Sequence, residues 1–359
     1  MAVTVRLAKG VQTPRHAYAF DLVFRVILQQ EWRWADGGDP DVVYGGNVPD
    51  SGLLSGTERI LTPPLNRWGP WLLPFVVGGK LDPFSFAFWM ATRMEEWTSE
   101  NRDVHGRFKA SATWSAQQGL LERPVVDEVV LKWASGFLAP FSLRSEKPFE
   151  WWATIDLDNA FAYRHKPLYK TLGGAVRDAI LGRWTQLMER GQVLLNKRED
   201  PFDTTHALME LHEKVGVKQR FFVLLADRGP HDRGVHYASE GLAQMANRIA
   251  QRTHIGLHPG YASHGNAVTI IRERLRLEEM IKQPVKTARQ HYLRHDPSVA
   301  WPALVEAGIR SDWSMGFADA MGFRAGLARP FPAYDLNQEC ALELEVYPVM
   351  VMEATLGRY

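Results

Sequence analysis

Two carboxylates stand two positions apart at the end of an apolar run, WWATIDLDNA, at residues 151–160. In an extended strand, side chains two positions apart point to the same face, so Asp156 and Asp158 are predicted to be near neighbours. Two anions held this close repel each other unless a proton or a cation lies between them. The spacing therefore predicts a site that holds a cation or shares a proton.

Histidines follow at the ends of later apolar segments. His258 ends one segment and His291 ends the next, while His264 follows His258 by six residues. Carboxylate and imidazole donors together suit a borderline divalent metal such as zinc, in a catalytic site that leaves one position for water. The pattern favours Asp158 and His258 as ligands. It leaves the third ligand open between His264 and His291.

The elements that must position these residues begin near residue 150, where short apolar segments alternate with amphipathic helices. The predicted strands cover residues 152–156, 219–225, 254–258, 286–291 and 342–347. The predicted helices cover residues 174–190, 204–215, 239–251, 267–282 and 298–307. This alternation indicates parallel strands with crossover helices, as an open sheet or a barrel. In both, functional residues lie where the chain leaves the carboxyl ends of the strands.

The part of the chain before residue 145 has a different character. Turn clusters rich in glycine and aspartate interrupt it, and only residues 85–96 and 125–137 show helical periodicity. A chain of 359 residues is long for one ordinary domain and about right for two. We therefore predict a smaller mixed α/β domain of unknown role over residues 1–145 and a second domain over residues 146–359.

Composition excludes several classes of function. The formal net charge is +1, so no global basic field exists to hold nucleic acid or an anionic membrane, although local patches stay open. No glycine-rich phosphate loop follows the first strand, which argues against nucleotide binding. The first residues lack the features of a signal peptide, and the single cysteine, Cys340, agrees with a reducing compartment. We expect a cytoplasmic protein with no nucleic-acid or membrane partner.

The order of these segments resembles the polysaccharide deacetylases of the NodB-homology type over roughly residues 150–356. TIDLD at 154–158 resembles the first motif of that family, TFDDG, and GLHP at 256–259 resembles its second motif. ARQHY at 288–292 falls where the family has an arginine-containing third motif. SDW at 311–313 and GFRAG at 322–326 resemble its later strand-end segments.

This resemblance implies a distorted (β/α) barrel and a hydrolase that uses a divalent metal, most often zinc, to remove an N-acetyl or O-acetyl group from a carbohydrate. Asp156 would be the general base, Asp158 a metal ligand, and Arg289 the residue that orients the base. Substrate contacts are expected from three further residues, of which the two aromatic ones could stack on a sugar ring: Tyr261, Asp312 and Trp313.

Several positions depart from the family pattern. Leu157 separates the two aspartates, the histidines of the second motif lie six rather than four apart, and no histidine follows His295 where the family has its general acid. Glu353 is the carboxyl group that could replace that acid, unless a last βα unit is absent. The alternative reading is a catalytically degenerate module that binds a glycan or a protein.

The N-terminal part carries a second resemblance. LDPF at 81–84, RMEE at 93–96 and DVHGRF at 103–108 resemble segments of an uncharacterised domain that precedes some bacterial deacetylase-like domains. The resemblance implies no role for that domain.

Overall fold

The computed structural model describes residues 2–97, 99–138 and 149–357. The chain divides into two compact units. Unit 1 consists of Met1–Pro148, Tyr292–Glu306 and Arg310–Tyr359, and unit 2 of Phe149–His291 and Ala307–Ile309. The boundary predicted near residue 145 lies outside the described residues. The two-domain assignment made from the sequence stays a prediction.

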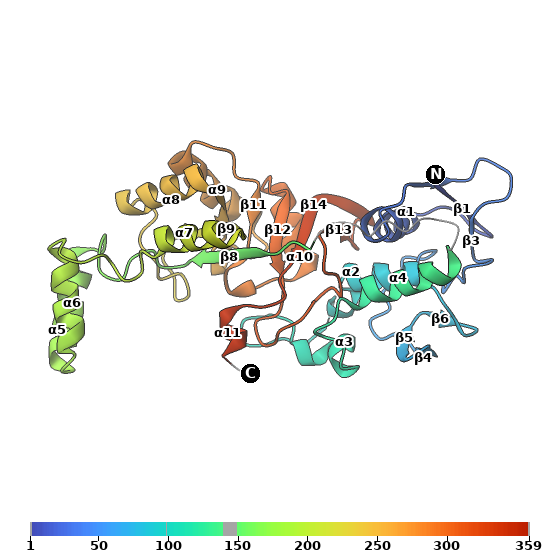
Figure 1. Ribbon diagram of the computed structural model, residues 1–359, viewed down its shortest axis with the longest axis horizontal. Helices are drawn as coiled ribbons and strands as arrows, with labels where there is room; N and C mark the ends of the chain where they lie inside the picture. The colour runs from blue at the N-terminus through green and yellow to red at the C-terminus, as the bar shows by residue number, and fades with distance from the viewer. Residues whose placement is uncertain (1, 98, 139–148, 358–359) are drawn as a thin grey trace. The chain divides into compact units, whose positions relative to one another are not determined.

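Unit 2 contains four parallel strands in the order β11-β10-β9-β8 (Figure 1). They are β8 (Trp152–Leu157), β9 (Lys218–Leu224), β10 (His254–His258) and β11 (Thr287–Ala288). Three crossover helices connect them, α7 (Thr205–Val215), α8 (Glu240–Arg252) and α9 (Ala267–Ile281). The predicted α/β class is therefore confirmed. The predicted strands and helices of this region lie within a few residues of the observed ones, except between residues 168 and 194.

The strand β9 is buried on both faces, with Phe221, Phe222 and Val223 fully covered. A nearly continuous apolar strand of this kind is typical of a parallel sheet whose two faces are covered by helices. Gly256 in β10 allows close approach to its neighbours: a Cβ added there would lie 2.9 Å from the Thr287 carbonyl oxygen and 3.0 Å from the Phe222 ring. A larger residue would push β10 away from β11.

One predicted helix is wrong. The sequence predicts a single helix over residues 174–190, whereas the structure has two, α5 (Leu168–Ile180) and α6 (Trp184–Leu194). Gly182 lies between them with φ +63°, a left-handed conformation that glycine adopts without strain and that ends a helix. The apolar spacing continues across the turn, which is why periodicity alone joined the two helices.

Unit 1 begins with a second parallel sheet, in the order β2-β1-β3. Its strands are β1 (Val3–Leu7), β2 (Trp32–Trp34) and β3 (Val42–Tyr44), and the helical segments of this region are α1 (Pro14–Phe20), the π-helical Asp21–Ile27, α2 (Pro83–Ala91) and α4 (Val125–Phe137). An aromatic cluster fills the core, with Phe20, Tyr44 and Phe84 in edge-to-face contact. Strands of three residues, such as β2 and β3, give too few alternations to be recognised from the sequence.

The helix α2 begins where the sequence indicates. The Asp82 side chain accepts a hydrogen bond from the Ser85 backbone N–H at 3.0 Å, and Pro83 occupies the first turn. An aspartate cap followed by proline satisfies a free N–H and fixes the first φ angle of the helix.

Unit 1 also contains β12 (Ser311–Met315), β13 (Phe331–Asp335), β14 (Cys340–Pro348) and α10 (Pro297–Glu306). β14 pairs in parallel with β12 and antiparallel with β13. The remaining short elements are β4 (Leu65–Trp68), β5 (Trp71–Pro74), β6 (Val76–Val77), β7 (Lys80–Leu81), α3 (Trp114–Gln117), α11 (Glu353–Leu356) and the 3₁₀ turns Met94–Glu96, Ala110–Ala112, Tyr261–Ser263 and His291–Leu293. Among the described residues, no helix has both the length and the apolar character needed to cross a membrane.

A buried ionic network joins the segment after α2 to the loop before β13. Glu96 accepts hydrogen bonds from Arg93 Nε at 2.7 Å and from Arg324 Nε at 2.9 Å, and all three side chains are buried. Burial alone would raise the pKa of Glu96, but Arg324 and Arg93 together lower it to about 2. The carboxylate is therefore ionised, and the two guanidinium groups compensate its burial.

We predict that Glu96→Gln destabilises the protein strongly, because the buried Arg324 would lose its carboxylate partner and the buried Arg93 would keep only Glu95. Breaking a buried ion pair in this way costs about 3–5 kcal/mol. Urea denaturation would measure the loss, with the exposed Glu100→Gln as control. Because the folded-state pKa of Glu96 is depressed, its contribution is complete above about pH 4.5 and is lost as the pH falls towards 2. Equal stability of the two variants would contradict the prediction.

Candidate metal centre

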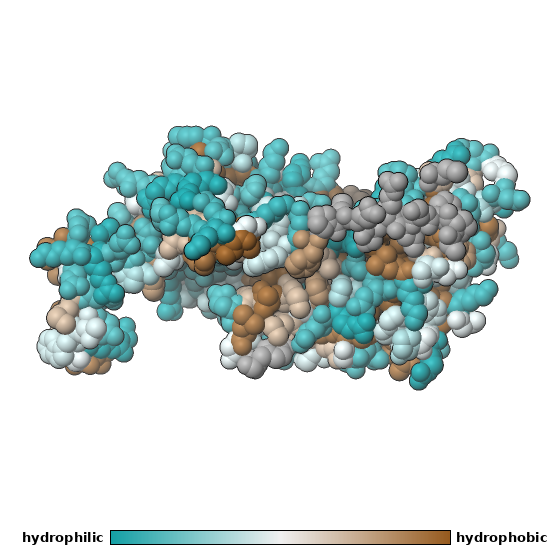
Figure 2. All heavy atoms as spheres, viewed as in Figure 1, coloured by the Kyte–Doolittle hydropathy of each residue, from teal (hydrophilic) through white to brown (hydrophobic). Residues whose placement is uncertain are grey.

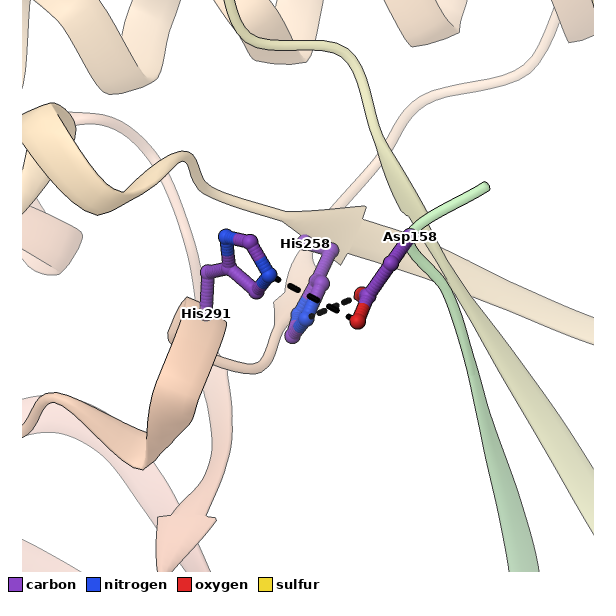
Figure 3. A group of neighbouring side chains, drawn as sticks. All are labelled: Asp158, His258 and His291. Carbon is purple, nitrogen blue, oxygen red and sulfur yellow. Dashed lines mark ion pairs between the residues drawn. The ribbon is translucent and has the colours of Figure 1, made fainter. Parts of the chain in front are cut away.

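Three side chains converge from the carboxyl ends of three parallel strands of unit 2. Asp158 follows β8, His258 ends β10, and His291 lies three residues after β11. One ligand atom from each lies within 4.8 Å of the others (Figure 3). Because parallel strands end at the same edge of a sheet, their carboxyl ends bring residues distant in sequence together.

The spacing of these atoms fits a small divalent metal. His258 Nε2 lies 3.2 Å from Asp158 Oδ1, and His291 Nε2 lies 3.6 Å from Asp158 Oδ2. Ligands about 2.0–2.1 Å from a tetrahedral zinc ion lie about 3.3 Å from one another. The distance from each imidazole nitrogen to the carboxylate is therefore close to the separation that such an ion requires.

The second nitrogen of each imidazole supports the same interpretation. His258 Nδ1 donates to the Arg289 carbonyl oxygen at 2.6 Å, and His291 Nδ1 donates to Asp232 Oδ1 at 2.9 Å. Metal-binding histidines usually make such a bond to a carbonyl or a carboxylate, which fixes the ring and leaves Nε2 for the metal. The carbonyl and carboxylate partners thus occupy both Nδ1 atoms, and both Nε2 atoms lie towards Asp158.

Asp232 was not identified from the sequence. It lies in the loop after β9, is buried, and also accepts a hydrogen bond from the Tyr261 backbone N–H at 3.0 Å. Burial alone would raise its pKa, but the bonds from His291 and Tyr261 lower it. The signal that could have found it is its place in the polar segment after a buried strand, where site residues of parallel sheets collect.

The site is buried on one side and open on the other. His258 and His291 expose 2% and 5% of their side chains, whereas Asp158 exposes 55%. Burial alone would lower the pKa of His291, but Asp158 and Asp232 raise it to about 9. Burial would raise the pKa of Asp158, but the two imidazoles lower it well below its usual value.

Asp156 lies beside the ligand group. Its Oδ1 accepts a hydrogen bond from Arg289 Nη1 at 3.2 Å, and its Oδ2 lies 3.9 Å from His258 Nε2. Asp156 and Asp158 thus approach the same imidazole nitrogen, in agreement with their two-residue spacing. The Arg289 side chain is buried against the Phe222 ring, 4.7 Å from its centroid, so the guanidinium is held in place next to the carboxylate.

Two further predicted residues lie in the same unit. His264 follows the turn Tyr261–Ser263, is half-buried, and is not part of the group of converging ligand atoms found among the described residues. The Tyr261 ring stacks on His231 with centroids 4.0 Å apart. The Tyr261 backbone N–H and the His291 ring both donate to Asp232, so Asp232 links Tyr261 to His291.

The other predicted residues belong to unit 1. Asp312 is fully buried and accepts hydrogen bonds from Ser314 and Trp301. Burial raises its pKa to about 6, against the hydrogen bonds from Ser314. The Trp313 ring is buried and stacks on Tyr347 at 4.1 Å, and Glu353 is exposed at the start of α11. Roles for these three in substrate binding or acid catalysis stay predictions.

Comparisons with known proteins match parts of the chain. Residues 73–139 match the model of a family of unknown function, DUF7033, so the N-terminal part carries a region of that uncharacterised family. No significant match was found among curated proteins. One solved structure, "Crystal structure of putative polysaccharide deacetylase from Mycobacterium smegmatis", matches with 15% identity and a TM-score of 0.32. The alignment covers 56% of this chain and 62% of that one, and similarity at this level carries no argument.

We predict that the purified protein binds about one divalent metal ion and that Asp158→Ala, His258→Ala and His291→Ala each abolish this binding. Asp232→Ala should weaken it about 10–100-fold, because the His291 ring would lose its orienting partner. His264→Ala is the matched control and should bind metal as the wild type does. Elemental analysis after dialysis against zinc would measure occupancy. Loss of metal in the control together with retention in His291→Ala would show that the wrong histidine has been assigned.

We predict that metal affinity rises with pH up to about pH 9. Metal ligation requires a neutral imidazole, whereas His291 with a pKa of about 9 carries a proton at pH 7. Zinc binding at pH 7 should therefore release about one proton from this residue, and affinity should rise about tenfold per pH unit. Calorimetry in buffers of different ionisation enthalpy would count the protons. An affinity that is constant between pH 6.5 and 8.5 would contradict the assignment.

Proposed function

We propose that this chain is a metal-dependent hydrolase that removes an N-acetyl or O-acetyl group from a carbohydrate. The observation that carries the proposal is the pairing of two sets of residues at the same sheet edge. The group Asp158, His258 and His291 can hold a metal, and the pair Asp156 and Arg289 lies next to it. The motif resemblance to polysaccharide deacetylases supplies the substrate class. A distorted barrel and a cytoplasmic location belong to the same proposal.

A divalent metal held by these ligands would polarise the acyl carbonyl group and lower the pKa of a bound water. Asp156 then has the position of a general base, because its Oδ2 lies only 3.9 Å from a ligand nitrogen while its other oxygen is held by Arg289. Arg289 keeps this carboxylate oriented towards the attacking water. The buried imidazoles exclude water from one side of the reacting group.

A second candidate function is a module that binds a glycan without hydrolysing it. The observation that favours it is the lack of any histidine after His295 in the sequence. His295 itself is fully buried next to Asp312, at 3.7 Å, so it has no surface to offer a substrate. This function predicts metal and glycan binding without release of acetate.

We predict that Asp156→Asn lowers acetate release about 10²–10⁴-fold, because the base is lost while the metal ligands remain. The measurement is acetate release from acetylated chitooligosaccharides and acetylated xylan by zinc-loaded protein. Asp227→Asn is the matched control, an exposed carboxylate in the loop after β9. Its activity should equal that of the wild type.

Metal content measured on the same samples separates the explanations. The proposal holds if Asp156→Asn keeps its metal and loses activity. It is wrong if wild type with a full metal complement releases no acetate from any of these substrates, and glycan binding under those conditions would establish the second candidate.

A further inference from the structure

The segment of residues 164–198, here called the arm, interrupts the connection between β8 and α7. Its two helices, α5 and α6, pack on each other, and within the described chain neither packs extensively on another helix or strand (Figure 1). Arg190 Nη2 of α6 pairs with Asp178 Oδ2 of α5 at 2.7 Å. A Cβ added at Gly174 would lie 2.8 Å from the same guanidinium group, so the helices are in close contact there.

The two ends of the arm are tied to each other. The buried carboxylate of Asp200 accepts hydrogen bonds from the backbone N–H groups of Ala162, Tyr163 and Arg164, at 2.7, 2.9 and 2.9 Å. The Tyr163 hydroxyl donates to Glu189 of α6 at 3.0 Å. The arm is therefore a folded projection with a closed base.

The arm exposes large apolar side chains to solvent. Four of them recur every fourth residue of α5 and so form one stripe: Leu168, Leu172, Val176 and Ile180. At the tip, Ile180 is 78% exposed, Leu181 52% and Trp184 63%. Figure 2 shows pale and brown surface on the arm beside the teal of its charged residues. Contiguous exposed apolar surface of this kind marks a binding surface in soluble proteins.

The arm is also strongly basic. Residues 164–198 contain eight lysines and arginines and two carboxylates, a formal charge of +6 on a chain whose total is +1. Both carboxylates are already paired, Asp178 with Arg190 and Glu189 with Arg198.

Three cations of the arm lie exposed near the apolar stripe or the tip: Lys170, Arg177 and Arg183. Within the part of the chain that the structure describes, none of the three has a carboxylate at ion-pair distance. Burial lowers the pKa of Lys166, and the neighbouring cations Arg190 and Lys170 lower it further, although the nearby Asp200 acts in the opposite direction. A lowered lysine pKa is expected in a region of positive potential.

We propose that the arm docks on an anionic lipid membrane surface, with Ile180, Leu181 and Trp184 inserted at the level of the headgroups and the cations facing lipid phosphates. Tryptophan prefers this interface, and an apolar face flanked by lysine and arginine is the pattern of interfacial helices. Contact between the arms of two copies of this chain is unfavourable, because two arms of charge +6 repel each other. The proposal concerns peripheral binding and is independent of the metal site.

The test is co-sedimentation of the full chain with vesicles. Phosphatidylcholine vesicles with about 30% phosphatidylglycerol should bind the protein, pure phosphatidylcholine should bind it far more weakly, and added salt should release it. A protein that stays in solution with anionic vesicles at low salt overturns the proposal.

Three sets of substitutions locate the surface. The tip variant Ile180→Ser, Leu181→Ser, Trp184→Ser should weaken vesicle partitioning at least about tenfold. The charge variant Lys170→Gln, Arg177→Gln, Arg183→Gln should weaken it about 100-fold. The control variant Val268→Ser, Leu275→Ser removes exposed apolar side chains of α9 and should partition like the wild type. Equal loss in all three sets overturns the assignment to the arm.

Three further measurements keep the outcome decisive. Circular dichroism melts of every variant show whether the fold is kept, and a dye on Leu181→Cys in a Cys340→Ser background reports directly whether the tip enters an apolar environment. Light scattering gives the mass in solution. The proposal is overturned if the wild type does not bind vesicles and instead forms a dimer that the tip variant abolishes. The partner of the arm would then be a second copy of the chain.

Discussion

The hydrogen bond from His258 Nδ1 to the Arg289 carbonyl oxygen, 2.6 Å long, is the interaction on which the candidate centre depends. It ties the end of β10 to the residue after β11 and fixes the imidazole with Nε2 towards Asp158. The same arginine uses its side chain to hold Asp156. Arg289 thus orients the His258 imidazole through its backbone and the Asp156 carboxylate through its guanidinium. The spacing of β10 and β11 therefore controls the orientation of both side chains.

That spacing follows from small features of the two strands. The Arg289 backbone N–H donates to the Leu257 carbonyl oxygen at 3.0 Å, which continues the parallel pairing beyond the short strand β11. Gly256 removes the side chain that would otherwise meet the Thr287 carbonyl oxygen. Two carboxylates complete the arrangement, because Asp158 lies beside both imidazoles on the exposed side and the buried Asp232 holds His291.

The sequence was sufficient for the parts that depend on local periodicity. The strands β8 and β10, and the two aspartates on one face of β8, follow from alternation and from the end of an apolar run. The choice between His264 and His291 could not be made in this way, since it depends on which strand lies beside β10. Asp232 lies in an irregular loop without any period, and Gly182 divides α5 from α6 without disturbing the apolar spacing. The sequence pattern also missed β1 to β3, of which β2 and β3 have only three residues and are too short to show alternation.

The unequal exposure of the three ligands has a kinetic consequence. The two imidazoles are held by packing and by their hydrogen bonds, whereas Asp158 stands in solvent on a strand end. An exposed carboxylate can detach and rebind without disturbing the core, so ion exchange would proceed by release of this ligand first. A chelator would reach the ion from the same side. Occupancy would then follow the free metal concentration without unfolding of the protein.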